Sequence, residues 1–98
     1  MKKLCISILS TIVVLLAPQL LVAQGDAAAG QAKSALCATC HGADGTSELS
    51  VNPKIAGQKF NYIVKQLQDY KSGARANATM AAMVAALSDE DIMDLAAW

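Results

Sequence analysis

The sequence has little of the residue types that most often bind metals: one histidine, His41, and three cysteines in 98 residues. Two of those cysteines, Cys37 and Cys40, precede His41 in the segment CATCH. A structural zinc site takes about four Cys or His ligands in a tetrahedral arrangement. Since this segment offers three such side chains, and since Cys40 and His41 are adjacent, we do not expect a zinc site.

The sequence also lacks the alternation of apolar and polar residues that marks a half-buried strand. Alanine is abundant and β-branched residues are few in the part that follows residue 23, which favours helix. We therefore predict an all-α fold of about four helices. Their expected ranges are 26–37, 58–72, 80–86 and 88–98, with a long loop over 41–57.

Local signals mark several helix ends. Asp26 is a suitable N-cap, and Gly73 predicts the C-cap of the second helix. Ser88 and Asp91 form a capping box in the segment SDED, with Asp91 where Glu is more common. An apolar stripe at helical spacing predicts the packed face of the second helix; its members are Phe60, Ile63, Leu67 and Tyr70.

The beginning of the chain is typical of a secretory signal peptide. Residues 1–3 are a basic start, and residues 4–16 are apolar apart from three hydroxyl residues. Pro18 then precedes the small residue Ala23. A basic start, an apolar run and a small residue at the end define such a peptide, so we predict a signal peptide over 1–23.

An uncleaved membrane anchor is the alternative for this segment. The apolar run to Ala23 is about long enough to span a bilayer. Pro18 and Gln19 interrupt it, which favours cleavage. We therefore expect a single exported domain over 24–98, associated with a membrane only if the signal segment is retained.

The predicted mature domain has no excess of positive charge. It holds six Lys and Arg against eight Asp and Glu, a net charge of −2. Nucleic-acid binding is therefore not expected. A domain this small usually needs a disulfide, a metal or another addition to its core, and a large buried cofactor would supply apolar contact.

The spacing in CATCH fits two further chemistries. A thioredoxin-like Cys-x-x-Cys begins a helix after a strand, whereas here the motif follows a helix. Cys-x-x-Cys-His is the attachment signature of c-type haem. Thiols about one helical turn apart can add to the two vinyl groups, and the next imidazole can reach the iron. We predict one haem c per chain, attached to Cys37 and Cys40 and ligated by His41.

The residue that binds the iron opposite His41 is less clearly indicated by the sequence than His41 itself. Because His41 is the only histidine, a second imidazole from this chain is excluded. A methionine, an amine or an open position remains. Met80 and Met83 follow the irregular segment GARANAT, whereas Met93 lies in a helix that we expect to pack. A thioether ligand raises the reduction potential relative to a second imidazole, which suits an electron carrier.

The chain resembles the class I c-type cytochromes. It is most similar to small bacterial periplasmic members and to one half of the dihaem bacterial cytochromes c. The resemblance covers 24–98 and rests on three segments: GDAAAGQAKSALCATCHGADG, NPKIAGQKFNYIVKQLQDYKSGAR and MAAMVAALSDEDIMDLAAW.

The resemblance implies roles for further residues. The backbone carbonyl of Pro53 would accept a hydrogen bond from the His41 imidazole. The distal methionine of this group lies seven residues before the leucine that matches Leu87, which gives Met80, with Met83 as the alternative. A small cytochrome c-like fold would wrap these groups around one haem.

Two more positions match places where the first and last helices of the family cross. Gly30 matches the small residue and Trp98 matches the aromatic one. The family's last helix extends a little beyond the aromatic position, so we expect this helix to be cut short at Trp98.

The function that the resemblance implies is electron transfer in the periplasm, with the iron cycling between Fe(II) and Fe(III) and no enzymatic reaction. Donor and acceptor proteins would dock weakly at the exposed haem edge. Two alternatives stay open. The domain could serve as the haem subunit of a larger oxidoreductase, or it could be a haem enzyme or gas-binding protein with an open sixth position.

Overall fold

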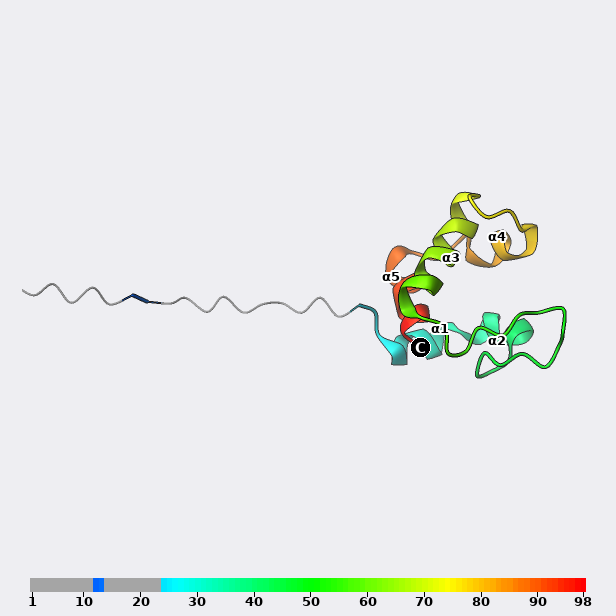
Figure 1. The fold of residues 1–98 in the computed structure, drawn as a ribbon, viewed down its shortest axis with the longest axis horizontal. Coiled ribbons are helices and arrows are strands. Elements are labelled where there is room, and N and C mark those ends of the chain that lie inside the picture. Colours follow the sequence, from blue (N-terminus) through cyan, green and yellow to red (C-terminus); the bar gives the residue numbers. More distant parts are fainter. Residues whose placement is uncertain (1–11, 14–23) are drawn as a thin grey trace, which may run out of the picture.

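The computed structural model describes residues 12–13 and 24–98, and within these residues it contains five helices and no strand (Figure 1). They are α1 (Ala27–Lys33), α2 (Ala35–His41), α3 (Phe60–Ser72), α4 (Ala78–Val84) and α5 (Asp89–Ala97). The all-α prediction is confirmed. The predicted signal peptide lies outside the described residues, apart from Ile12 and Val13. None of the helices described is long and apolar enough to cross a membrane.

The first expected helix, over 26–37, is in fact two helices. At Ser34 the backbone N–H bonds to the carbonyl of Gln31 at 3.2 Å, and the Ser34 hydroxyl donates to the same carbonyl at 2.7 Å. Serine hydroxyls that bond to nearby backbone carbonyls in this way often bend helices. The chain becomes helical again when Ala38 N–H bonds to Ser34 O, and α2 then continues to His41.

Three caps follow the sequence signals. Asp26 accepts hydrogen bonds from the N–H groups of Ala28 and Ala29. Gly73 ends α3 in the left-handed conformation, with φ of 85°. The capping box of α5 is complete, because the Ser88 and Asp91 side chains each accept the other residue's backbone N–H, at 3.1 and 2.9 Å.

The start of α4 differs from the expected range of 80–86. The side chain of Asn77 accepts the N–H of Met80 at 2.9 Å and caps the helix two residues earlier than expected. Met80 therefore lies within the first turn of α4 rather than being its first residue, as the expected range had it.

Helices α1 and α5 cross in close contact, as the predicted pairing of Gly30 with Trp98 requires. Gly30 is buried, and a Cβ atom there would lie 1.9 Å from the backbone oxygen of Asp94 and 3.0 Å from Trp98 Cβ. No side chain fits in that space. The glycine thus allows the two backbones to approach each other.

A buried carboxylate joins the same two helices. Asp94 accepts hydrogen bonds from the backbone N–H of Asp26 at 2.8 Å and from Lys33 Nζ at 2.6 Å. Lys33 also pairs with Asp91 at 2.8 Å. The hydrogen bond from Lys33 lowers the pKa of Asp91 to about 2 and holds the pKa of Asp94 below its ordinary value.

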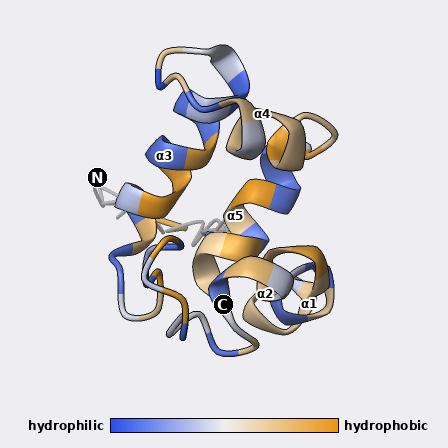
Figure 2. Ribbon diagram, turned by 90° about the vertical axis from the view of Figure 1, so that its right-hand side faces the viewer, coloured by the Kyte–Doolittle hydropathy of each residue, from blue (hydrophilic) through white to orange (hydrophobic). Residues whose placement is uncertain are grey.

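The fully buried apolar core is small. Among the described residues, Val84 of α4 and Ile92 of α5 are the only hydrophobic side chains that are buried. Helix α3 packs against both α4 and α5, and its hydrophobic residues lie on the side nearer α5 (Figure 2). The predicted stripe on α3, from Phe60 to Tyr70, is only half-buried. The domain therefore depends on more than an apolar core.

We predict that Gly30→Ala destabilises the protein. Alanine is favoured over glycine in a helix by about 1 kcal/mol, so a substitution without steric conflict would stabilise α1. Here the added methyl group overlaps the Asp94 carbonyl, and we expect a net loss of about 1–3 kcal/mol in unfolding free energy. Chemical denaturation measures it, with the exposed Ala32→Gly as a propensity control. A Gly30→Ala variant as stable as wild type would contradict the close crossing.

Asp91 and Asp94, which pair with Lys33, should make the free energy of unfolding depend on pH. Their pKa values are lower in the folded state than the ordinary 3.8, so their contribution is present above that value. It is lost as the pH falls from about 5 to about 2. We expect Lys33→Met to reduce this fall in unfolding free energy, whereas Lys65→Met, which removes an exposed ion pair, leaves it unchanged. Equal effects of the two substitutions would contradict this assignment.

Candidate haem site

His41 is the last residue of α2 and is 9% exposed. Its Nδ1 lies 2.8 Å from the backbone oxygen of Pro53, so the contact expected between these residues is present. A carbonyl oxygen only accepts, so Nδ1 carries the proton and donates it. Nε2 is then the unprotonated nitrogen, with its lone pair available to a metal.

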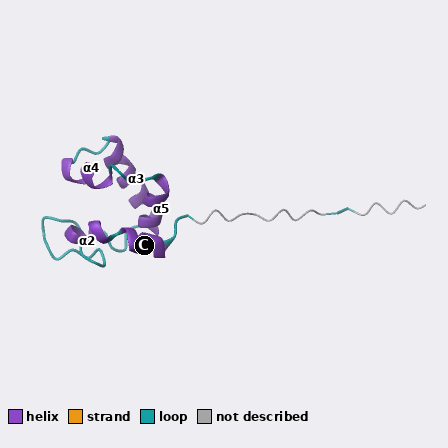
Figure 3. Cartoon of the chain, turned by 180° about the vertical axis from the view of Figure 1, so that it is seen from behind, coloured by secondary structure: helices purple, strands orange, loops and turns teal. Residues whose placement is uncertain are grey.

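The loop after α2 folds back so that Pro53 reaches His41. Figure 3 shows this long loop beside α2. Gly42 and Gly45 both have positive φ, at 86° and 77°, which lets the chain reverse. The N–H groups of Ile55 and Ala56 then bond to the carbonyl of Gly45 at 2.8 and 2.9 Å. The loop is therefore closed just beyond Pro53.

The two cysteines lie on successive turns of α2. Cys37 is half-buried and Cys40 is exposed, and the two are not joined by a disulfide. Burial raises the pKa of the Cys37 thiol. Cys37 lies four residues before His41, so the two side chains share one face of the helix.

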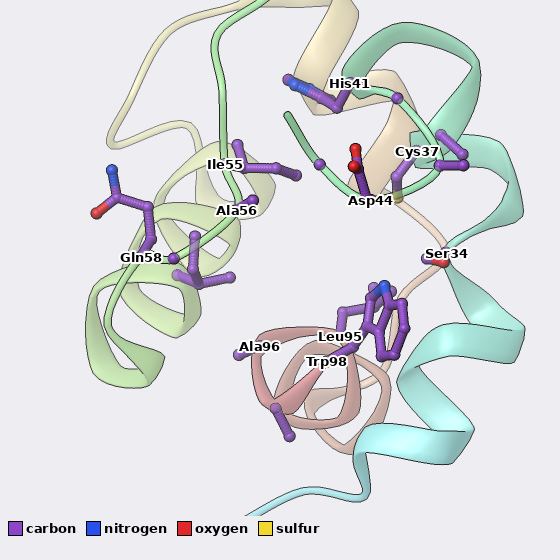
Figure 4. A pocket seen from close by; sticks show the side chains of 17 residues that line it. Ser34, Cys37, His41, Asp44, Ile55, Ala56, Gln58, Leu95, Ala96 and Trp98 are labelled. Atoms are coloured by element: carbon purple, nitrogen blue, oxygen red, sulfur yellow. The ribbon is translucent and has the colours of Figure 1, made fainter. Parts of the chain in front are cut away.

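A cavity of about 440 Å³ lies beside Cys37 and His41. It falls within the size range of small-molecule sites. Several segments line it: α2 contributes Cys37 and His41, and the loop contributes Ile55 (Figure 4). Ile63 of α3, Leu95 of α5 and Trp98, which directly follows α5, line the rest.

The residues at this cavity fit a haem. Cys37 lines the cavity together with the His41 imidazole, whose Nε2 is free, and with apolar walls that include an indole ring. Cys40, one turn from Cys37, is exposed and lines a neighbouring pocket. Ile55 and Trp98 remain 36% and 50% exposed, so apolar surface is available to a flat hydrophobic group. Within residues 12–13 and 24–98, no group of three or more His, Cys, Asp and Glu side chains could hold a metal ion by itself.

Met80, the predicted distal ligand, is not among the residues that line this cavity. It is half-buried on α4, and α4 lies on the same side of the molecule as α2 in Figures 1 and 3. Met83 is more exposed, at 39%, and Met93 lies on α5. The structure thus brings Cys37, His41 and Pro53 together, and it places Met80 on a separate helix.

Sequence reasoning missed the apolar lining residues Ile55 and Leu95. Ile55 is the last large apolar residue of the loop, in the segment NPKIAG, which is a detectable signal. Leu95 gave no such signal, because an apolar residue in an amphipathic helix is more often core.

Comparison with known proteins agrees with this site. Residues 24–98 match the family described as cytochrome C oxidase, cbb3-type, subunit III. The chain belongs to this cytochrome c family. Covalently bound haem c, with its iron, follows from that membership, and Cys37 and Cys40 fit the attachment motif.

Several relatives define the resemblance more closely. Cytochrome c4 of Pseudomonas aeruginosa is 47% identical over 98 residues, which is all of this chain but 47% of that protein. Cytochrome c-554(548) of Halomonas halodenitrificans is 42% identical over 77 residues, covering 76% of this chain and 93% of that protein.

A solved structure shows the same fold. The crystal structure of reduced recombinant cytochrome c4 from Pseudomonas stutzeri has a TM-score of 0.71 and 46% identity, covering 74% of this chain and 43% of that chain. This cytochrome domain therefore spans just under half the length of the cytochromes c4 that it matches. The predicted cytochrome c-like fold, and the resemblance to one half of a dihaem cytochrome, are confirmed.

We predict that the two thiols attach haem independently. Cys37→Ala and Cys40→Ala should each retain covalent haem through the remaining thioether, whereas the double variant should lose it. Haem staining of a denaturing gel and intact-mass spectrometry measure the attachment. Thr39→Ala, which lies between the two cysteines and removes no thiol, is the matched control and should keep both thioethers. Covalent haem in the double variant would show that the attachment lies elsewhere.

Proposed function

We propose that residues 24–98 form a periplasmic monohaem electron-transfer domain, exported by a signal peptide over residues 1–23. The observation that carries the proposal is the hydrogen bond between His41 and Pro53 beside two thiols at haem-attachment spacing. A bound haem iron supplies a one-electron Fe(II)/Fe(III) couple. No substrate bond is made or broken, so the domain by itself is not an enzyme.

In this proposal His41 is the proximal ligand and Pro53 orients it. The carbonyl of Pro53 accepts a hydrogen bond from Nδ1–H. This bond fixes the orientation of the ring and raises the electron density at Nε2. Cys37 and Cys40 would attach the haem to α2 as thioethers. Trp98 and Ile55 provide apolar contact that excludes water from the haem face.

Met80 is the proposed distal ligand. The segment that leads to it is anchored to α3, because the guanidinium of Arg75 lies 4.7 Å from the Tyr70 ring centroid and donates to Gln66 at 2.6 Å. Asn77 then fixes the first turn of α4 at Met80 itself. A thioether ligand from Met80 would favour Fe(II) and would leave no coordination site for a substrate.

Redox partners would dock at the exposed side of α2, where Cys40 reaches the surface. Leu36 beside it is 58% exposed, and Thr39 and Ala43 are also exposed. Small exposed side chains let a partner approach the haem edge, and redox encounters of this kind bury less than about 1,200 Å². With a net charge of −2, we expect little long-range electrostatic steering.

A second candidate is a haem-bearing subunit of a larger oxidoreductase. The description of the matching family, a subunit of a cytochrome c oxidase, favours it. Purification of the full chain from its native membrane and periplasmic fractions distinguishes the two. A free monomer in the periplasmic fraction supports the soluble carrier, and stable co-purification with other oxidoreductase subunits supports the second candidate.

We predict that Met80→Ala converts the oxidised haem to a high-spin form that binds CO when reduced. Absorption spectra measure this, because the weak far-red thioether–iron band should disappear. Met83→Ala is the matched control, since it removes a methionine one turn away, and it should keep the wild-type spectrum. If only Met83→Ala becomes high-spin, Met83 is the ligand. A wild-type protein that is already high-spin would favour an enzyme or gas-binding protein.

A further inference from the structure

Ser47 connects the backbone of His41 to the segment that carries Pro53. Its N–H donates to the carbonyl of His41 at 2.8 Å. Its hydroxyl oxygen lies 2.7 Å from the carbonyl of Asn52 and 3.1 Å from that of Leu49. Asn52 directly precedes Pro53. Ser47 therefore makes hydrogen bonds both at His41 and beside Pro53, the two partners of the His41–Pro53 hydrogen bond.

The backbone of Ser47 is in an unfavourable conformation. Its φ is 47°, and it is the only residue other than glycine with positive φ among those described. The left-handed conformation costs free energy for any residue with a Cβ, and such strain often marks a functional position. Glycine would adopt this φ without that cost, but it could not supply the hydroxyl group.

We propose that Ser47 is a positioning residue for the axial histidine. Its hydroxyl fixes the loop on the N-terminal side of Pro53, while the bonds of Ile55 and Ala56 to Gly45 fix the other side. With both sides fixed, the Pro53 carbonyl stays in line with Nδ1 of His41. The strength of that hydrogen bond sets the electron density on the ligating Nε2, and so the relative stability of Fe(III).

This inference rests on the proposed ligation of the iron by His41. Loss of the Ser47 hydroxyl leaves the closure at Gly45 intact, so the loop should remain folded with a looser Pro53 carbonyl. A weaker bond to Nδ1 makes His41 a poorer donor to Fe(III), and the reduction potential should rise. The Nδ1 proton should also exchange with solvent faster.

The test compares haem-loaded Ser47→Gly and Ser47→Ala with wild type. Both remove the hydroxyl, but only glycine relieves the strain at φ of 47°. We expect both to raise the midpoint potential and to speed Nδ1–H exchange several-fold, up to about tenfold, as for the loss of one hydrogen bond. The alanine variant should be the less stable of the two, with the same shift in potential.

Two further variants separate positioning from general loop damage. Thr46→Ala removes the neighbouring hydroxyl, which bonds to Asp44 and not to the Pro53 segment, and it should keep the wild-type potential and exchange rate. Ser47→Asn tolerates positive φ and can donate to Asn52, so it should restore both values towards wild type.

Unchanged potential and exchange in Ser47→Gly and Ser47→Ala would overturn the role of Ser47, as would equal changes in Thr46→Ala. Failure of the underlying ligation is distinguishable, because it would be seen in wild type. The oxidised wild-type protein would then lack the strongly shifted NMR signals of an iron-bound His41, and this outcome would overturn both proposals.

Discussion

The hydrogen bond from His41 Nδ1 to the carbonyl of Pro53 is the interaction on which the rest of the site depends. It determines which ring nitrogen is free to bind iron, and it fixes the ring at the end of α2. The bond can form only if the loop between the two residues reverses direction. Gly42 and Gly45 allow the reversal, and the bonds of Ser47 hold it in place. The conformation of the loop therefore determines which nitrogen of His41 is available to bind a metal.

The crossing of α1 and α5 positions the helix that carries His41. Helix α2 continues α1 after the bend at Ser34, so the placement of α1 also directs Cys37 and His41. Gly30 brings α1 against α5, and buried Asp94 binds both ends of α1 through Asp26 and Lys33. As a result, the end of α5 lines the same cavity as Cys37 and His41. Close backbone contact and a buried carboxylate hold these helices together, as a larger apolar core does in bigger domains.

Much of this could be predicted from the sequence because the signals are local. The motif CATCH, the cap at Gly73 and the capping box at Ser88 each lie within a few residues, and short-range geometry decides them. The bend at Ser34 and the early start of α4 at Asn77 could not be predicted as readily, because a hydroxyl or amide side chain can bond to the backbone in several ways. The role proposed for Ser47 could be recognised only in the folded loop, because its partners are six residues before it and five after it.

The two sides of the proposed haem site are constrained very differently. On the proximal side, His41 and Pro53 lie in one continuous segment whose ends are hydrogen-bonded to each other. On the distal side, Met80 lies on a short helix that packs mainly on α3. The segments before and after this helix are bonded to α3, by Arg75 to Gln66 and by Lys71 to the Leu87 carbonyl. Few fully buried side chains hold that helix, Val84 being the one within it. A perturbation of the domain should therefore displace the methionine before the histidine. In the proposed site, the proximal loop would therefore set the electronic properties of the iron, and the distal helix would decide whether the methionine remains bound to it.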